Sequence, residues 1–132
     1  MSSIFSKIIT GEIPCYKIAE SKDYFAFLDI SPLTKGHTLV VPKVETDYIF
    51  DLENEHFAGL HLFSKIIAEA LKKSVVCNRV GVCIIGLEVP HAHIHLIPFE
   101  AMSDMNFSNP KLKLSIEEMT LIAEKIKSNL PI

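Results

Sequence analysis

Three of the six histidines of this chain alternate in the segment His91-Ala92-His93-Ile94-His95-Leu96-Ile97. Because a β-strand sends alternate side chains to opposite faces, the segment predicts a strand with His91, His93 and His95 on one face and apolar residues on the other. A helix would turn by roughly 100° per residue and spread the rings around its axis. Pro90 and Pro98 bracket the segment, as expected for a strand, because proline is confined to strand starts and edges.

The composition is that of one ordinary globular domain, which we expect to span residues 1–132. Hydrophobic residues make up 48% and charged residues 22% of the chain, which excludes a disordered polar chain. The net charge of −3 argues against a nucleic-acid partner. Three cysteines without a Cys-x-x-Cys pair argue against a disulfide framework and favour the cytoplasm. No segment resembles a signal peptide or a membrane span, so no membrane partner is expected.

Hydrophobic periodicity predicts three helices. The first is short, is capped by Ser2 or Ser3, has apolar residues at positions 4, 5, 8 and 9, and ends near Gly11. The second is long and spans residues 54–74, with an apolar stripe along one face. The third opens on the capping box Ser115-x-x-Glu118.

Strand patterns predict a hairpin of residues 15–20 and 24–28, a third strand at 38–41 that Pro42 stops, and a fourth at 79–85. Because residues 79–85 are nearly all apolar, this strand is expected in the centre of the sheet. Residues 101–111 are expected to form a loop. The predicted fold class is therefore α+β: a mostly antiparallel sheet of about five strands, one long helix, and shorter N- and C-terminal helices.

Three histidines on one face suit two kinds of chemistry. A His-x-His pair can bind a metal ion, but His91 and His95 would lie about 13 Å apart at Cα, so another ligand such as His37 would be needed. Alternatively, a neutral imidazole can attack a phosphoryl group while neighbouring rings donate hydrogen bonds to the phosphate oxygens. His93 has a ring on each side and is the natural nucleophile. A purely structural role for the rings is the third interpretation.

The histidine segment resembles the signature of the histidine-triad (HIT) superfamily. Other blocks are similar to its Hint-like branch and occur in the expected order, namely Ile4-Phe5-x-Lys7-Ile8-Ile9-x-x-Glu12-Ile13-Pro14, Phe27-Leu28-Asp29-Ile30-Ser31-Pro32, Gly36-His37-Thr38-Leu39-Val40-Val41-Pro42-Lys43 and Gly86-Leu87-Glu88-Val89-Pro90-His91. The resemblance covers most of the chain. It implies a mixed α+β fold and a homodimer to which the long helix contributes the contact.

The resemblance implies a hydrolase or nucleotidyl transferase that acts at the α-phosphate of a purine nucleotide and needs no cofactor. His93 matches the nucleophile, His95 a phosphate-contacting ring, His91 a supporting ring, and His37 a further histidine of the ring network. Asp29 matches the carboxylate that accepts hydrogen bonds from both ribose hydroxyls. The residues that match the walls of the base pocket are Ile4, Phe5, Ile8, Phe27 and Ile30. Glu88 and Val89 belong to the loop whose backbone N–H groups can face the phosphate.

Three departures from the family pattern affect these expectations. Some members bind structural zinc through a Cys-x-x-Cys pair and a later histidine, but Ser3, Ser6 and Glu45 occupy these positions, so no metal is predicted. Leu87 and Glu88 replace a glutamine and a serine or threonine, which removes a phosphate donor and brings an acid near the phosphate unless it points away. Isoleucines 84 and 85 occupy the region where some members carry an asparagine.

Three hypotheses follow for the function. The first is an enzyme that cleaves adenosine phosphoramidates or other AMP conjugates, with dinucleoside polyphosphates as the alternative substrates. The second is a nucleotide-binding regulatory module with little turnover, which the residues at positions 87 and 88 favour. The third is a metal-dependent enzyme that uses a His-x-His pair.

Overall fold

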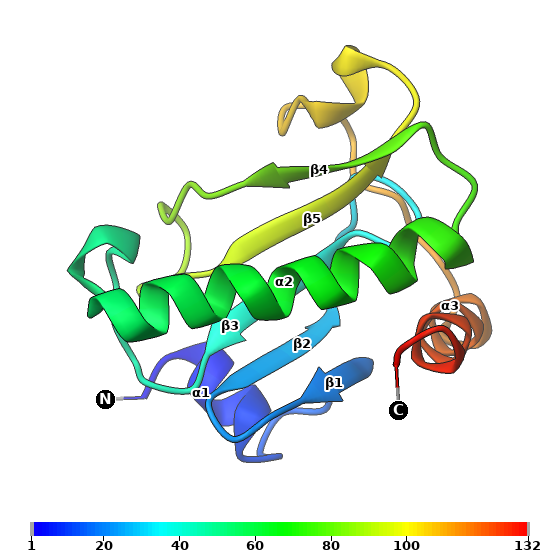
Figure 1. Ribbon diagram of the computed structural model, residues 1–132. Coiled ribbons are helices and arrows are strands. Elements are labelled where there is room, and N and C mark those ends of the chain that lie inside the picture. The colour runs from blue at the N-terminus through cyan, green and yellow to red at the C-terminus, as the bar shows by residue number, and fades with distance from the viewer. Residues whose placement is uncertain (1, 132) are drawn as a thin grey trace.

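The structure, a computed structural model, describes residues 2–131 and is organised around one antiparallel sheet (Figure 1). Its five strands lie in the order β1-β2-β3-β5-β4. The strands are Lys17–Glu20 (β1), Tyr24–Leu28 (β2), Thr38–Pro42 (β3), Arg79–Cys83 (β4) and Ile94–Phe99 (β5). The helices are Ile4–Ile9 (α1), Asn54–Ser74 (α2) and Ile116–Ser128 (α3), with short 3₁₀ turns at Ile49–Asp51 (η1) and Met102–Met105 (η2). The predicted α+β class is confirmed.

Side-chain alternation along the strands gives the sheet two different faces. The face covered by α2 and α3 is the larger core, and its strand residues include Ala26, Leu28, Val40, Ile94 and Leu96. The opposite face is a smaller core of Phe25, Phe27, Leu39 and Val41, which packs against Phe5 of α1. Because His95 lies between Ile94 and Leu96 in β5, its side chain points to the α1 face.

The helix ends follow from local sequence. Ser3 caps α1 by accepting a hydrogen bond from the N–H of Ser6. The predicted bounds of the long helix, residues 54–74, are those of α2. The predicted capping box is also present, because the Ser115 hydroxyl accepts from the N–H of Glu118 and the Glu118 carboxylate accepts from the N–H of Ser115.

The prediction that the fourth strand lies in the centre of the sheet is wrong. β4 is an edge strand, ends at Cys83 instead of residue 85, and leaves the Val82 side chain 59% exposed. Its apolar residues are exposed or only partly buried, unlike those of a strand in the centre of a sheet. Val80 packs against the larger core, and Gly81 lies under Met105 of η2, where a Cβ atom would come within 2.8 Å of the Met105 methyl.

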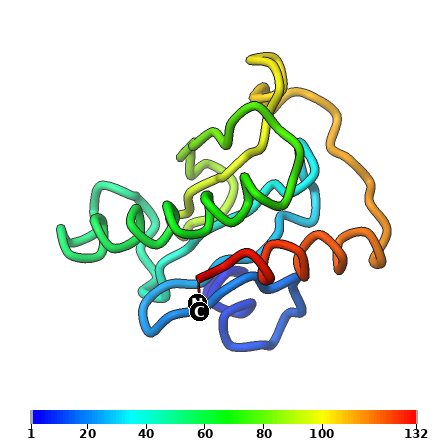
Figure 2. Tube along the Cα trace, turned by 45° about the vertical axis from the view of Figure 1, so that its right-hand side comes forward, coloured from blue at the N-terminus to red at the C-terminus, as the bar shows by residue number. Residues whose placement is uncertain are grey.

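The limits of β2 are those predicted, and the limits of β1, β3 and β5 differ from prediction by one or a few residues. β1 begins at Lys17, β3 includes Pro42, and β5 includes Pro98 instead of ending before it. In a β-strand the N–H and the carbonyl of one residue point to the same side. The carbonyl of Pro98 accepts from the Thr34 hydroxyl, on the side where β3 no longer pairs with β5. The N–H that proline lacks would therefore have no partner in β3, and proline is tolerated here. The predicted loop at 101–111 contains η2, and the chain then runs along the outside of the molecule to α3, as the orange segment of Figure 2 shows.

No helix within residues 2–131 has the length and apolar character that crossing a membrane requires. The cysteines at positions 15, 77 and 83 are all free thiols. The cytoplasmic location stays a prediction.

Gly36 precedes His37 and offers a test of how tightly this corner is packed. Its φ is +90°, and an added Cβ would come within 2.9 Å of Val75 and 3.0 Å of Leu71. We expect Gly36→Ala to lower the free energy of unfolding by about 2–4 kcal/mol, since left-handed strain and overpacking add. The matched control is Gly11→Ala, where φ is +87° but no atom lies within 4 Å. Here strain alone predicts a loss of about 1–2 kcal/mol in urea unfolding. Equal losses would contradict the packing argument.

Candidate functional site

The three histidine rings gather on the α1 face, although they do not share one strand. β5 begins at Ile94, so only His95 lies in it, and the predicted strand over all three histidines is wrong. The preceding backbone leaves the ladder because the N–H of His91 bonds to the carbonyl of Val89 and that of Ala92 to the carbonyl of Thr46. The extended segment still brings His93 beside His95, with ring centroids 4.8 Å apart.

His91 is completely buried, and its hydrogen bonds fix its tautomer. Its Nε2 lies 2.8 Å from the carbonyl oxygen of Pro42, which can only accept, so Nε2 carries the proton. Nδ1 is then an acceptor and receives the hydroxyl proton of Ser3 at 2.7 Å. This ring has no free nitrogen for a ligand and supports the site instead.

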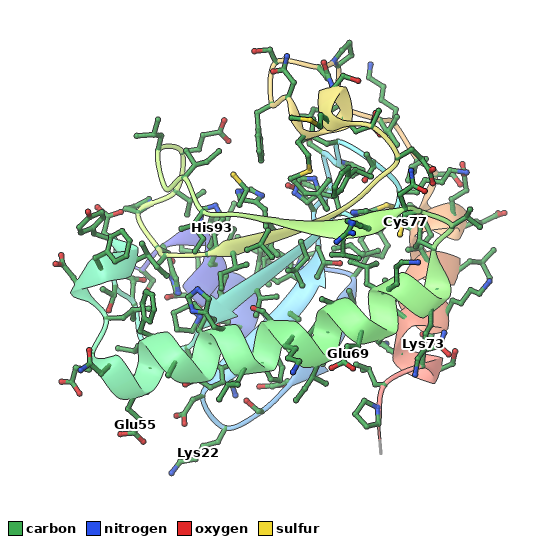
Figure 3. All side chains as sticks on the ribbon, turned by 45° about the horizontal axis from the view of Figure 1, so that its top comes forward. Lys22, Glu55, Glu69, Lys73, Cys77 and His93 are labelled. Atoms are coloured by element: carbon green, nitrogen blue, oxygen red, sulfur yellow. The ribbon has the colours of Figure 1, made fainter. Side chains whose placement is uncertain are left out.

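His93 (labelled in Figure 3) has the arrangement that a nucleophile needs. Its Nδ1 lies 2.8 Å from the carbonyl oxygen of His91, so Nδ1 is the protonated nitrogen and Nε2 keeps its lone pair. The ring packs edge-on against Phe5, with centroids 5.0 Å apart. Burial lowers the pKa of His93, which keeps the ring neutral and nucleophilic at neutral pH.

His37 and His95 form a directional pair beside the nucleophile. The N–H of Leu33 donates to Nδ1 of His37 at 3.0 Å, which leaves the proton of this ring on Nε2. Nε2 donates to Nδ1 of His95 at 2.9 Å, so His95 must carry its own proton on Nε2. Burial, with smaller effects from neighbouring rings, lowers the pKa of His37 to about 3 and that of His95 to about 4. His95 is therefore a neutral donor suited to a phosphate oxygen.

Asp29 follows β2 and lies beside this pair. Its Oδ1 accepts from the N–H of Ser31 at 2.9 Å, and Oδ2 lies 3.6 Å from Nε2 of His37. Burial raises the pKa of Asp29, and the charge of Glu88 raises it further. The carboxylate is partly exposed and retains lone pairs for hydroxyl donors of a ligand.

The predicted apolar wall separates into buried and accessible residues. Phe5 and Phe27 are buried in the smaller core, with ring centroids 5.6 Å apart, and Ile8 and Val89 pack against it. Ile4 and Ile30 have exposed side chains that a ligand could cover, and Ile30 is 75% exposed. The structure thus brings the phenylalanines together under the site and leaves the two isoleucines at its surface.

The loop before His91 offers few side-chain donors. Leu87 is 88% exposed, and its side chain has no polar atom for a phosphate. The charge of Glu88 adds to the raised pKa of Asp29 and slightly offsets the lowering of the His93 pKa by burial, so this acid lies near both residues. A phosphate here would depend on His95 and on backbone N–H groups.

Phe107 is a site residue that sequence analysis missed. Its ring lies edge-on to His95 and His37, with centroid distances of 5.0 and 6.3 Å. The segment is held by the N–H of Leu112, which donates to the carbonyl of Pro32 at 2.8 Å. No periodic pattern marks Phe107, and the only available signal was that it is the one aromatic residue of the loop at 101–111.

Two groups of residues offer candidate metal ligands, and neither has the chemistry that a metal ion prefers. Asp29, His37 and His95 have ligand atoms within 4.8 Å of one another. However, a metal on Nε2 of His37 would move the proton to Nδ1, which faces the N–H donor of Leu33. At the positions of the family zinc site, Ser3 and Ser6 offer neutral hydroxyls in place of the thiolates that zinc prefers. That no metal is bound stays a prediction.

Comparisons with known proteins extend these observations. A family model described as "HIT domain" matches residues 10–102. The adenosine 5'-monophosphoramidase hnt1 of Schizosaccharomyces pombe is 34% identical over 98% of this chain and 99% of its own length. The adenosine 5'-monophosphoramidase HNT1 of Saccharomyces cerevisiae is 40% identical over 72% of this chain and 61% of its own.

Solved structures are similar over nearly the whole chain. A Hit-like protein involved in cell-cycle regulation from Bartonella henselae has a TM-score of 0.84 and 30% identity, covering 98% of this chain and 97% of its own. A Zn-bound histidine triad family protein from Mycobacterium smegmatis has a TM-score of 0.81 and 28% identity, with coverage of 97% and 95%.

Proposed function

Because this chain belongs to the HIT family, we propose that it hydrolyses purine nucleotide conjugates at the α-phosphate through a nucleotidyl group on His93. The observation that carries the proposal is the hydrogen bond from Nδ1 of His93 to the carbonyl of His91, which leaves the Nε2 lone pair free to attack. One HIT domain over residues 1–132 would suffice for this chemistry.

The proposed reaction has two displacements at phosphorus. Nε2 of His93 forms a bond to the α-phosphorus, and the bond to the leaving group breaks with its electron pair remaining on that group. The positive charge on the ring is dispersed toward the carbonyl of His91, and Nε2–H of His95 donates to a phosphate oxygen. An amine leaving group takes up a proton from solvent. Water then displaces the histidine, gives up a proton to solvent and releases the nucleoside monophosphate.

Adenosine phosphoramidates and adenylylated small molecules are the proposed substrates. Two relatives are named as adenosine 5'-monophosphoramidases, which supports an amine leaving group. Asp29 would accept hydrogen bonds from the ribose hydroxyls, and Ile4 and Ile30 would contact the base. The second candidate is a nucleotide-binding module with little turnover, which the exposed Leu87 favours because it supplies no phosphate donor.

The test is incubation of untagged protein with adenosine 5'-phosphoramidate and chromatographic measurement of AMP, with a diadenosine polyphosphate as a parallel substrate. Acid-quenched samples are examined by mass spectrometry for an AMP adduct on the peptide that contains His93. AMP release with the adduct supports the proposal. Tight AMP binding without release would favour the regulatory module, and release that a chelator abolishes would favour a metal-dependent enzyme.

We infer that the protein is a homodimer joined through α2 and β4. Exposed apolar side chains from both elements, Leu62, Ile66 and Val82, are available for this contact. β4 also has an unpaired edge. Figure 3 shows Glu55 at one end of α2 and Lys73 at the other. A two-fold axis across α2 would therefore place opposite charges together.

Leu62→Glu should convert the dimer to a monomer, because it buries an unpaired charge in the interface. We expect at least about a hundredfold weaker association in sedimentation equilibrium. The control is Leu121→Glu on α3, another exposed leucine outside the proposed contact, which should leave the dimer intact. A wild-type protein that is monomeric at micromolar concentrations would refute the inference.

A further inference from the structure

A chain of hydrogen bonds connects the surface residue Glu45 to the proposed nucleophile. One oxygen of Glu45, Oε1, accepts from the backbone N–H of Ser3 and from the hydroxyl of Ser6, both at 2.6 Å. The hydroxyl of Ser3 donates to Nδ1 of His91 at 2.7 Å. The carbonyl of His91 in turn accepts from Nδ1 of His93. These hydrogen bonds thus connect four residues from three separate segments, Ser3, Ser6, Glu45 and His91, to the ring of His93.

The position of Ser3 makes this chain directional. Its oxygen already accepts from the N–H of Ser6 at 3.0 Å, and its hydroxyl proton is directed to His91. Nε2 of His91 is committed as a donor to Pro42, so Nδ1 can only accept. Within residues 2–131, Ser3 is the one partner of that nitrogen, and both side chains are buried.

We propose that Ser3, anchored by Glu45, is a positioning residue that sets the orientation of the His93 nucleophile through His91. The inference rests on the proposed function, because it concerns the rate of attack by His93. Loss of the Ser3 hydroxyl would leave a buried acceptor unsatisfied, and the His91 ring would turn or admit water to satisfy it. Such a shift moves the carbonyl that holds His93.

The same residue joins the nucleophile to the wall of the proposed base pocket. Ser3 is the N-cap of α1, and Phe5 of that helix contacts the rings of His91 and His93 at centroid distances of 5.8 and 5.0 Å. A cap that only stabilised α1 would affect folding and base binding. A positioning residue affects turnover, and the two roles are separable by experiment.

The kinetic test compares Ser3→Gly with Ser3→Thr. Glycine keeps most of the capping stability but lacks the hydroxyl, whereas threonine keeps both. We expect kcat for AMP release to fall about tenfold in Ser3→Gly with less than a twofold change in KM. Ser3→Thr should retain wild-type kcat. Ser115→Gly removes the capping hydroxyl of α3, outside the site, and is the matched control that should leave kcat unchanged.

Glu45 supplies a second pair of variants at an exposed position, where folding is not at risk. Glu45→Gln keeps an oxygen for Ser3 and Ser6 and should retain kcat, whereas Glu45→Ala should lower it. Equal kcat in all four Ser3 and Glu45 variants, or a loss confined to KM, would overturn the proposal.

An NMR measurement separates failure of this inference from failure of the proposed function. Ring ¹H–¹⁵N correlations of the wild type should show His91 protonated on Nε2 and His93 on Nδ1. In Ser3→Gly the His93 signals should shift toward tautomer averaging, while in Ser115→Gly they should not. If the wild type released no AMP, the proposed function would be refuted, but the ring correlations would still report on the hydrogen bonds. Unchanged His93 signals in Ser3→Gly would refute the positioning role.

Discussion

Replacing His93 with alanine is expected to lower kcat/KM for AMP release by at least about 10³-fold, because the variant lacks the group that forms the covalent bond to phosphorus. The other rings cannot substitute. His91 uses both ring nitrogens within the protein, and Nδ1 of His95 accepts from His37, so its Nε2 carries a proton. Neither ring presents a lone pair to the ligand side.

The loss should be specific to chemistry. AMP affinity of His93→Ala should change by less than about tenfold, since the proposed ribose contact at Asp29 remains. His61→Ala is the matched control, because His61 lies on α2 with Nδ1 bonded to the carbonyl of Phe57, on the opposite side of the sheet from the site. Full activity in His93→Ala, or equal losses in both variants, would contradict a covalent role for His93.

Local patterns were sufficient for the features that depend on neighbouring residues. The period of α2, the cap at Ser115 and the alternation that directs His95 to one face depend on contacts within a few positions. The buried residues of β2 follow the same logic, because Phe27 and Leu28 point to opposite faces. The family resemblance then placed His37 near the triad, and its hydrogen bond to His95 agrees with that placement.

Features set by distant segments were not predictable in this way. The apolar composition of β4 indicated burial, but strand order depends on pairing across the sheet, and β4 lies at its edge. The strand expected to include His91 begins only at Ile94. The backbone N–H groups of His91 and Ala92 bond to the carbonyls of Val89 and Thr46 instead of to a neighbouring strand. Phe107 reaches His95 from a segment without periodicity, so only the folded chain reveals this contact.

The paired histidines also make the stability of the fold sensitive to acid. His37 and His95 are buried, and their pKa values are lowered to about 3 and about 4. The groups that face the pair are Asp29, His93 and Lys111, together with the ring of Phe107. Below the ordinary histidine pKa of about 6.5, these two histidines bind protons in the unfolded chain but stay unprotonated in the folded chain. Stability must therefore fall as the pH decreases through this range. Asp29 acts in the opposite direction, because its raised pKa favours proton uptake by the folded state.

We expect the free energy of unfolding, measured in urea, to fall by at least about 3–4 kcal/mol between pH 7 and pH 5, with about 2 kcal/mol from each of these two rings. His93 adds a contribution of the same sign, because burial lowers its pKa as well. His95→Asn keeps an oxygen that can accept from Nε2 of His37 but cannot titrate in this range, so it should remove about 2 kcal/mol of the pH dependence. A stability that is flat from pH 7 to pH 5 would mean that the two rings accept protons in the folded state, and the neutral donor assigned to His95 would then be wrong.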